Sequence, residues 1–258
     1  MNDLPYFLVG IISGISSGLF GIGGGIIIVP SMLSLNLSSH SAIGISVFQM
    51  IFASIFGSYL NYKKKNLNIK DGIFIGIGGL IGASFSGIFL KYISDITLTS
   101  IFLFVSIIFF IKYAFGLKEN ITNTKRSNIL KNIILLTCGA FTGIFAISLG
   151  IGGGLLIAPI LAYFLGYDSK KVVPLSLFFI IFASISGIFS FINSNIIDEQ
   201  IIKKGFIVGI ASIIGVFIGI KIMEKITISY HRIFLLSIYL LSILMTAYNL
   251  AKKLNLSF

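Results

Sequence analysis

Two glycine-rich segments contain the residues whose type and spacing could do chemistry in this sequence. They read GIGGGIIIVP at 21–30 and GIGGGLLIAP at 150–159. Glycine clusters let the backbone leave helical geometry, and proline cannot donate to the hydrogen-bond ladder of a helix. Where a helix resumes after such a break, its first N–H groups and its dipole form an anion-binding site.

We therefore predict that these segments bind a small anion, with short helices starting at Gly24 or Gly25 and at Gly153 or Gly154. The expected substrate-binding residues are Gly21, Gly23, Gly24, Gly25, Pro30, Gly150, Gly152, Gly153, Gly154, Pro159, Ser46 and Ser176. The two serines are included because they occupy equivalent positions of an internal repeat. The alternative is that the glycines only allow close packing of helices.

Other polar side chains near these segments are weaker candidates. They are Ser16, Ser17, Ser31 and Ser148 beside the glycines, Gln49 within an apolar run, and the repeat-related pair Ser54 and Ser184. Each hydroxyl could bind an oxyanion or could bond a carbonyl of its own helix four residues back. No Asp or Glu falls inside a predicted span, so a proton pump built on buried carboxylates is not supported.

No catalytic, metal or cofactor site is expected. His40 and His231 fall in predicted loops or at a helix start, where solvated side chains are the simpler interpretation. The single cysteine, Cys138, excludes an intrachain disulfide and a thiolate metal cluster. The sequence offers no recognisable nucleophile with its base, so we do not expect an enzyme.

The composition places these residues in a membrane protein. Of 258 residues, 56% are hydrophobic and only 10% are charged, whereas a soluble domain is about 25% charged. The net charge is +11, and the basic residues border the apolar runs. This pattern indicates membrane topology rather than nucleic-acid binding. The runs occupy 4–36, 41–61, 72–92, 96–117, 129–165, 171–192, 205–222 and 228–250. We predict an all-α membrane bundle of about eight transmembrane helices, with glycine-broken first helices in two repeats.

An internal repeat relates the two halves of the chain. Residues 14–30 match 143–159 with nine identities in 17 positions. Residues 42–57 match 172–187 with eight identities in 16, and 69–82 match 202–215 with seven in 14. Three matching blocks in the same order predict homologous halves. We place them at 1–117 and 129–258, with four transmembrane helices each and a cytoplasmic linker at 118–128.

The distribution of basic residues predicts the topology. If each glycine-rich run crosses the membrane once, 13 of the 19 Lys and Arg residues lie on one side. The positive-inside rule then places both termini in the cytoplasm, and the halves are parallel repeats. If each run crosses twice, the repeats are inverted and the N-terminus lies outside. We expect the first apolar run to be a mature span rather than a cleaved signal peptide.

The paired motifs GIGGGIIIVP and GIGGGLLIAP, with the duplicated eight-run plan, resemble the TauE/SafE family of sulfite and organosulfonate exporters. The resemblance runs essentially end to end. It implies a permease for a small sulfur oxyanion, such as sulfite, thiosulfate or an organosulfonate, in the bacterial plasma (inner) membrane. It also implies that the matching glycines and prolines surround the pathway.

The expected partners are a small anionic solute and the lipid bilayer, with no nucleic acid, and homo-oligomerisation is left open. Two alternatives remain beside a transporter: a non-transporting scaffold or accessory subunit, and an anion channel. A scaffold predicts continuous, tightly packed helices at both GIGGG segments, with no cavity between the halves. A transporter predicts broken helices that face a polar cavity near the middle of the membrane.

Overall fold

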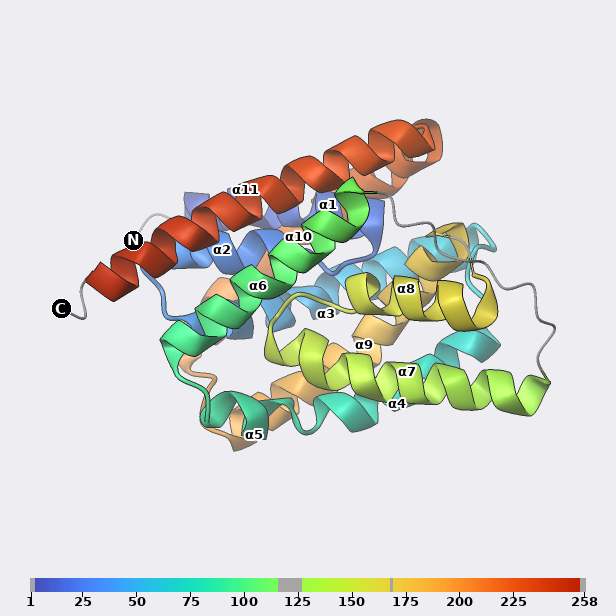
Figure 1. Cartoon of the computed structure of the whole chain (residues 1–258), viewed down its shortest axis with the longest axis horizontal. Coiled ribbons are helices and arrows are strands. Elements are labelled where there is room, and N and C mark those ends of the chain that lie inside the picture. The colour runs from blue at the N-terminus through green and yellow to red at the C-terminus, as the bar shows by residue number, and fades with distance from the viewer. Residues whose placement is uncertain (1–2, 116–126, 168, 256–258) are drawn as a thin grey trace.

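The computed structural model describes residues 3–115, 127–167 and 169–255, and these residues form a bundle of helices (Figure 1). The first half contains α1 Leu4–Phe20, α2 Gly25–Ser34, α3 Ser39–Lys63, α4 Ile69–Ala83, α5 Ser86–Lys91 and α6 Asp95–Ala114. The second half contains α7 Asn128–Ser148, α8 Gly154–Leu165, α9 Ser169–Asn193, α10 Glu199–Lys225 and α11 Ile228–Asn255. The predicted all-α membrane bundle is confirmed. Most of the expected linker, 118–126, lies outside the described residues.

The number of membrane-spanning helices differs from the expected eight. Within the described residues, seven helical segments are long and apolar enough to cross a membrane, with α4 and α5 counted as one segment. Three apolar helices, α1, α2 and α8, are shorter. A ten-residue helix such as α2 rises about 15 Å, which is half of the hydrocarbon core of a bilayer. These short helices therefore enter the bundle, but none of them crosses the membrane by itself.

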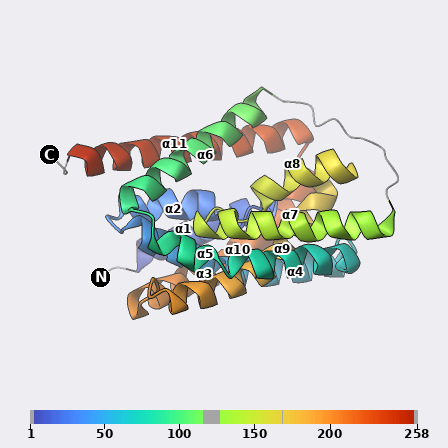
Figure 2. The same ribbon diagram turned by 60° about the horizontal axis from the view of Figure 1, so that its bottom comes forward.

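The first glycine-rich run enters and leaves the bundle at the same face. The Lys204 Nζ lies 5.5 Å from the centre of the Tyr6 ring, so α1 begins beside the start of α10. The Lys252 Nζ donates a hydrogen bond of 2.8 Å to the Asn36 side chain, so α2 ends beside the end of α11. Because α10 and α11 are successive full-length helices, these two ends share one face. We call it the terminal face, since α1 starts and α11 ends there (Figures 1 and 2).

The second glycine-rich run does the same at the opposite face. The Asp71 carboxylate lies 2.6 Å from the Lys131 Nζ and accepts a hydrogen bond of 2.6 Å from the Tyr167 hydroxyl. The starts of α4 and α7 and the end of α8 therefore meet at one face. We call it the basic face, because its connections carry most of the Lys and Arg residues of the chain.

The expectation of one net crossing for each glycine-rich run is therefore wrong. Each run doubles back at its glycines, and α7, one of the seven long segments, belongs to the second of these runs. The remaining helices of each half make three full crossings. Repeat-related helices consequently run in opposite directions. Gly57 of α3 packs against Leu177 of α9, whereas Gly187 of α9 packs against Val47 of α3. The expected parallel repeats are replaced by the inverted arrangement.

Glycine stripes hold the central helices together. A Cβ atom on Gly14 of α1 would lie 2.2 Å from the carbonyl oxygen of Ser212 on α10. A Cβ atom on Gly82 of α4 would lie 2.0 Å from the carbonyl oxygen of Ala140 on α7. Any side chain at these two glycines would separate the helices.

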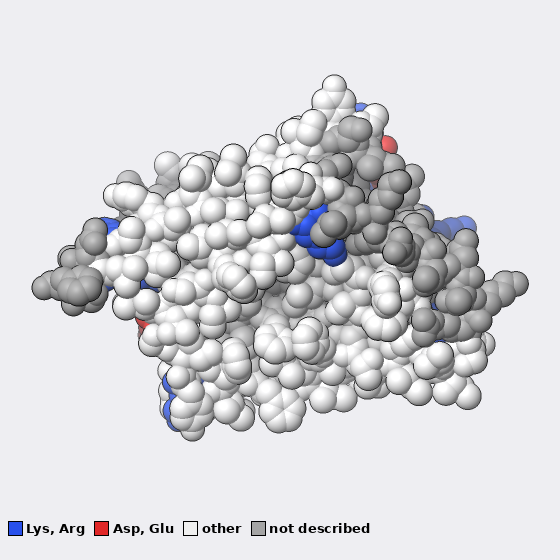
Figure 3. Space-filling view, in the orientation of Figure 1, with Lys and Arg blue, Asp and Glu red and all other residues white. Residues whose placement is uncertain are grey.

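The outer surface suits contact with lipid. Figure 3 shows a face made almost entirely of uncharged residues, with few patches of Lys or Arg. On the peripheral helices α6 and α11, Phe104 is 65% exposed and Leu244 is 60% exposed. Such extensive apolar exposure would be unfavourable in water and is ordinary in a bilayer.

Candidate functional site

The first break interrupts the helical run at residues 21–24. Helix α1 ends at Phe20, and α2 begins at Gly25 with Gly24 as its N-cap. The φ angle of Gly24 is +83°, in the left-handed region that side chains rarely adopt. This angle lets the chain reverse within a few residues.

The second break is built in the same way. Helix α7 ends at Ser148, and α8 begins at Gly154 with Gly153 as its N-cap. Gly152 carries the left-handed conformation here, with φ of +86°. The predicted starts of both short helices are therefore confirmed.

The two breaks lie against each other as antiparallel segments. A Cβ atom on Gly25 would lie 1.6 Å from the carbonyl oxygen of Gly150. A Cβ atom on Gly154 would lie 2.5 Å from the carbonyl oxygen of Gly21, and one on Gly152 would lie 2.0 Å from that of Ile22. Only glycine allows this backbone approach, so the structure brings the predicted glycines of the two halves together.

Ser46 and Ser176 join the breaks to the long central helices. Ser46 on α3 donates a hydrogen bond of 2.7 Å to the carbonyl oxygen of Gly150. Ser176 on α9 donates an equal bond of 2.7 Å to the carbonyl oxygen of Gly21. Each serine thus holds the break of the other half. Their hydroxyl hydrogens are already engaged, so in this conformation neither donates to a ligand.

Both short helices begin at the buried centre without a side-chain cap. Among the described residues, no side-chain cap bond is present at the start of α2 or of α8, whose N-caps are Gly24 and Gly153. Gly25 and Ile26 are buried, and so are Gly154 and Leu155. The ends therefore present positive dipole ends and N–H groups inside the protein. Among the described residues the two breaks pack directly against each other, whereas the transporter interpretation predicted that they face a polar cavity.

Unpaired polar side chains accompany the first break. Gln49 is fully buried, and neither its amide nitrogen nor its amide oxygen has a hydrogen-bond partner within the described residues. It lies one turn after Ser46, so the two side chains share one face of α3. The hydroxyls of Ser16 and Ser17 on α1 are also buried and unpaired. A buried polar group without a hydrogen-bond partner lowers the stability of the fold. Such groups in a native protein therefore point to a functional role.

The repeat does not reproduce this polar cluster at the second break. The position equivalent to Gln49 is Phe179, at the repeat offset of 130. The Phe179 ring fills the space beside Gly153, because its Cε1 atom lies 2.3 Å from a Cβ atom built on that glycine. The site is therefore polar on one side and apolar on the other.

Comparison with known proteins agrees with this geometry. The profile of the family described as "Sulfite exporter TauE/SafE" matches residues 6–246. The chain belongs to the TauE/SafE family.

Curated relatives of this TauE/SafE protein carry the name of probable membrane transporters. One from Methanocaldococcus jannaschii is 34% identical over 249 residues, which covers 90% of each chain. One from Bacillus subtilis is 28% identical and covers 84% of this chain and 87% of its own. One from Haemophilus influenzae is 28% identical and covers 73% of each. No solved structure matches the chain.

Several predicted residues of this TauE/SafE protein lie away from the contact between breaks. Pro30 and Pro159 lie inside α2 and α8 rather than at the breaks. Ser54 and Ser184 donate to carbonyls of their own helices, those of Ile51 and Ile180. These two hydroxyls follow the local alternative foreseen for them. Ser31 is half-buried within α2, and Ser148 lies 3.5 Å from the carbonyl oxygen of Ser86.

His40 differs from the predicted solvated side chain. It lies in the first turn of α3, is half-buried, and places its Nε2 atom 3.2 Å from the carbonyl oxygen of Leu90. Its Nδ1 atom lies 3.7 Å from the Asp95 carboxylate. The side chain of His231 lies outside the described residues. Within the described part of the chain, no three His, Cys, Asp or Glu residues come together as a metal site.

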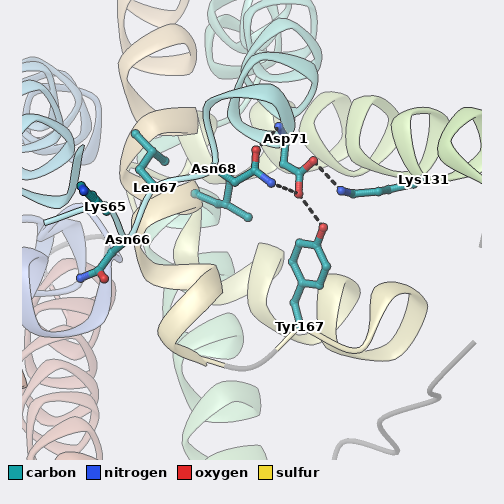
Figure 4. A pocket seen from close by; sticks show the side chains of 8 residues that line it. Lys65, Asn66, Leu67, Asn68, Asp71, Lys131 and Tyr167 are labelled. Carbon is teal, nitrogen blue, oxygen red and sulfur yellow. Dashed lines mark hydrogen bonds and ion pairs between the residues drawn. The ribbon is translucent and has the colours of Figure 1, made fainter. Parts of the chain in front are cut away.

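A polar pocket at the basic face was not predicted (Figure 4). It centres on Asp71, which was assigned to a connection but lies in the first turn of α4 and is only 5% exposed. The predicted span began one residue too late to include it. The only signal in the sequence is a carboxylate directly beside an apolar run, because its partners come from distant segments.

Proposed function

We propose that this TauE/SafE protein moves a small anion, a sulfur oxyanion such as sulfite, thiosulfate or an organosulfonate, through the two breaks. Membership of a transporter family supplies the class of activity. The observation that carries the anion assignment is the meeting of two uncapped, buried helix N-termini, those of α2 and α8. Each such terminus carries about half a positive charge and free N–H donors.

We expect a preference for singly charged anions. Every Lys in the described part of the chain lies in a connection or within the first or last two turns of a helix. The two helix termini together supply about one positive charge. Hydrogen sulfite or an alkyl sulfonate would be balanced by that charge. A dianion such as thiosulfate would bring uncompensated charge into a region of low dielectric constant.

The membrane potential can supply the driving force. A negative interior expels an anion with about 2.3 kcal/mol per charge per 100 mV. Neither break contains a carboxylate that could couple a proton to transport. Passive export is therefore the simplest mechanism. Strict dependence of flux on a pH gradient at fixed voltage would contradict it.

The orientation follows from the doubled-back runs. The connections at the basic face, 61–71, 112–131, 165–171 and 221–232, hold four, five, two and three Lys or Arg residues, which is 14 of 19. The positive-inside rule favours the cytoplasm for this face. Both termini then lie outside the cell, in place of the cytoplasmic termini expected from single crossings. The bacterial plasma membrane remains the proposed location.

Anion flux into proteoliposomes tests the proposal. Sulfite, thiosulfate, a short alkyl sulfonate and chloride are compared with protein-free liposomes. We expect saturable flux of the sulfur oxyanions, faster for hydrogen sulfite and the alkyl sulfonate than for the dianion thiosulfate. Gln49→Leu should lower it by roughly tenfold or more, as for the loss of one hydrogen bond to a charged group. Ser54→Ala should leave it unchanged, because that hydroxyl already bonds its own helix.

Two results would contradict the proposal. Absence of flux for every anion tested would remove its basis and favour the non-transporting scaffold. Equal flux in the wild type and in Gln49→Leu would place the pathway away from the first break.

A further inference from the structure

The pocket at the basic face is built by both halves of the chain. It has a volume of about 400 Å³. Its lining residues are Lys65, Asn66, Leu67, Asn68, Asp71, Lys131, Tyr167 and Leu175. Residues 65–71 belong to the first half, and the others belong to the second. The pocket therefore lies at the boundary between the two halves, where a relative movement of the halves would widen it.

Asp71 joins three elements inside this pocket. Its carboxylate lies 2.6 Å from the Lys131 Nζ of α7. It also accepts a hydrogen bond of 2.6 Å from the Tyr167 hydroxyl and one of 3.2 Å from the Asn68 amide. The Asp71 side chain is only 7% exposed, so its charge needs these partners. Figure 4 shows the three partners converging on the carboxylate.

The pocket lies directly above the first break. Leu175 of α9 lines the pocket and is 2% exposed, so it closes the floor. The next residue, Ser176, donates to the carbonyl oxygen of Gly21. Val173, on the same helix end, has its Cα 3.1 Å from a Cβ atom built on Gly21. One layer of side chains thus separates the pocket from the break.

Tyr167 connects this cluster to the second break. It follows directly on α8, the short helix that leads from the second break to the basic face. The bond from Tyr167 to Asp71 therefore fixes the outer end of α8 to the start of α4. A movement of the end of α8 away from the start of α4 would break that bond.

The terminal face closes the corresponding helix α2 by different chemistry. The Asn249 amide donates a bond of 3.0 Å to the Ser34 hydroxyl at the end of α2. Lys252 donates a bond of 2.8 Å to Asn36 just beyond it. No carboxylate takes part in these two bonds. The terminal face has an ion-paired carboxylate of its own, because the Lys253 Nζ of α11 lies 2.6 Å from the Asp95 carboxylate at the start of α6. That pair joins two long helices, whereas the Asp71 cluster holds the end of the short helix α8.

We propose that the pocket is the mouth of the anion pathway on the basic face, and that Tyr167, Asp71 and Lys131 form the latch that closes it. This inference rests on the proposed transport function. Lys65 and Lys131 attract the anion to the pocket. An anion that arrives there competes with Asp71 for both of its donors, the Lys131 ammonium and the Tyr167 hydroxyl, and so frees the end of α8.

Cysteine accessibility tests the latch without measuring transport. Cys138 is first replaced by Ala, and Val173→Cys then places one thiol at the break beneath the pocket. The rate of its reaction with a membrane-impermeant thiol reagent applied at the basic face is measured in proteoliposomes. Tyr167→Phe and Asp71→Asn should each raise this rate by roughly tenfold or more, the population shift expected for the loss of one hydrogen bond to a charged group.

Tyr163→Phe is the matched control. This tyrosine lies on α8 and is 57% exposed, so its replacement should leave the rate unchanged. Addition of methanesulfonate to the protein with an intact latch should raise the rate, because the anion competes with Asp71. Equal rates in Tyr167→Phe, Asp71→Asn and Tyr163→Phe would overturn the proposal.

The outcome also separates the latch from the transport proposal. Faster labelling in the latch variants without flux of any sulfur oxyanion would leave the latch standing and overturn the substrate assignment. Flux of sulfur oxyanions with labelling that does not respond to either latch variant would leave transport standing and overturn the latch.

Discussion

The Ser46 hydroxyl donates a hydrogen bond of 2.7 Å to the carbonyl oxygen of Gly150, from a helix of one half to the break of the other. Its repeat mate, Ser176, makes the same bond to Gly21. The two bonds satisfy carbonyl groups that helix α1 and the second break leave without helical partners. They also remove negative potential from the region where the starts of α2 and α8 would receive an anion. These serines therefore position the site rather than bind its ligand in this conformation.

Loss of the Ser46 hydroxyl is expected to destabilise the protein. Ser46→Ala leaves the buried carbonyl of Gly150 unpaired, which costs about 1–3 kcal/mol. The free energy of unfolding in detergent, measured by denaturant titration, checks this value. Ser54→Ala is the control, and Ser176→Ala should match Ser46→Ala. If Ser46→Ala and Ser54→Ala unfold alike, these bonds do not hold the breaks.

A methyl group at Gly25 is expected to separate the two breaks. Its Cβ atom would lie 1.6 Å from the backbone oxygen of Gly150, which cannot move away alone. Gly25→Ala should therefore lose the monodisperse peak in size-exclusion chromatography. Gly44→Ala is the control, since the atoms nearest to its Cβ belong to side chains, the closest being the Cγ2 atom of Ile201 at 3.0 Å. A stable Gly25→Ala protein with normal flux would show that the contact between breaks is dispensable.

Gln49 is expected to lower the stability of the protein and to support anion flux. Gln49→Leu removes an unpaired buried amide and should be neutral or stabilising by about 1 kcal/mol. The same change should lower anion flux, because the amide is then missing from the pathway. Both quantities are measured on one preparation, with Ser54→Ala as the control, because that hydroxyl bonds its own helix. A Gln49→Leu protein that is clearly less stable would identify the amide as a structural group.

The local structure at the breaks could be predicted from the sequence, because it depends on residues close together in the chain. Glycine clusters followed by a proline located the starts of α2 and α8 at Gly25 and Gly154. The repeat alignment pairs Ser46 with Ser176 from the sequence alone. Both inferences needed only local backbone chemistry and internal comparison.

The direction of the chain after each break could not be predicted in the same way. A long apolar run has the same hydropathy whether it crosses once or doubles back. The Lys and Arg counts also favoured one side under the single-crossing assumption, because two basic connections, 61–71 and 112–131, share a face in either arrangement. The pocket around Asp71 could not be predicted, because Lys131 and Tyr167 are distant in the sequence and approach Asp71 only in the folded protein.

Tyr167 is expected to make stability depend on alkaline pH. Burial, together with the Asp71 carboxylate, raises the pKa of Tyr167 to about 12 from its ordinary value of 10.0. The folded protein thus holds this proton more tightly than the unfolded chain. The resulting stabilisation is complete below pH 10 and is lost as pH rises toward 12.

The melting temperature in detergent, measured in steps from about pH 9 to pH 12, checks this expectation. The wild type should lose stability more steeply than Tyr167→Phe across that range. The difference between the two curves removes the contribution of the lysines, which titrate in both proteins. Parallel curves would show that the phenol proton is not held more tightly in the folded state.

The start of α1 is expected to face outside the cell, and this distinguishes the doubled-back runs from single crossings. Three variants are made in a Cys138→Ala background: Asp3→Cys, Asn36→Cys and Asn66→Cys. All three positions are exposed, and the first two lie at the terminal face. An impermeant thiol reagent on intact cells should label Asp3→Cys and Asn36→Cys, and should reach Asn66→Cys only after permeabilisation. Single crossings would instead place Asp3 and Asn66 on the same side, so protection of Asp3→Cys in intact cells would contradict the orientation.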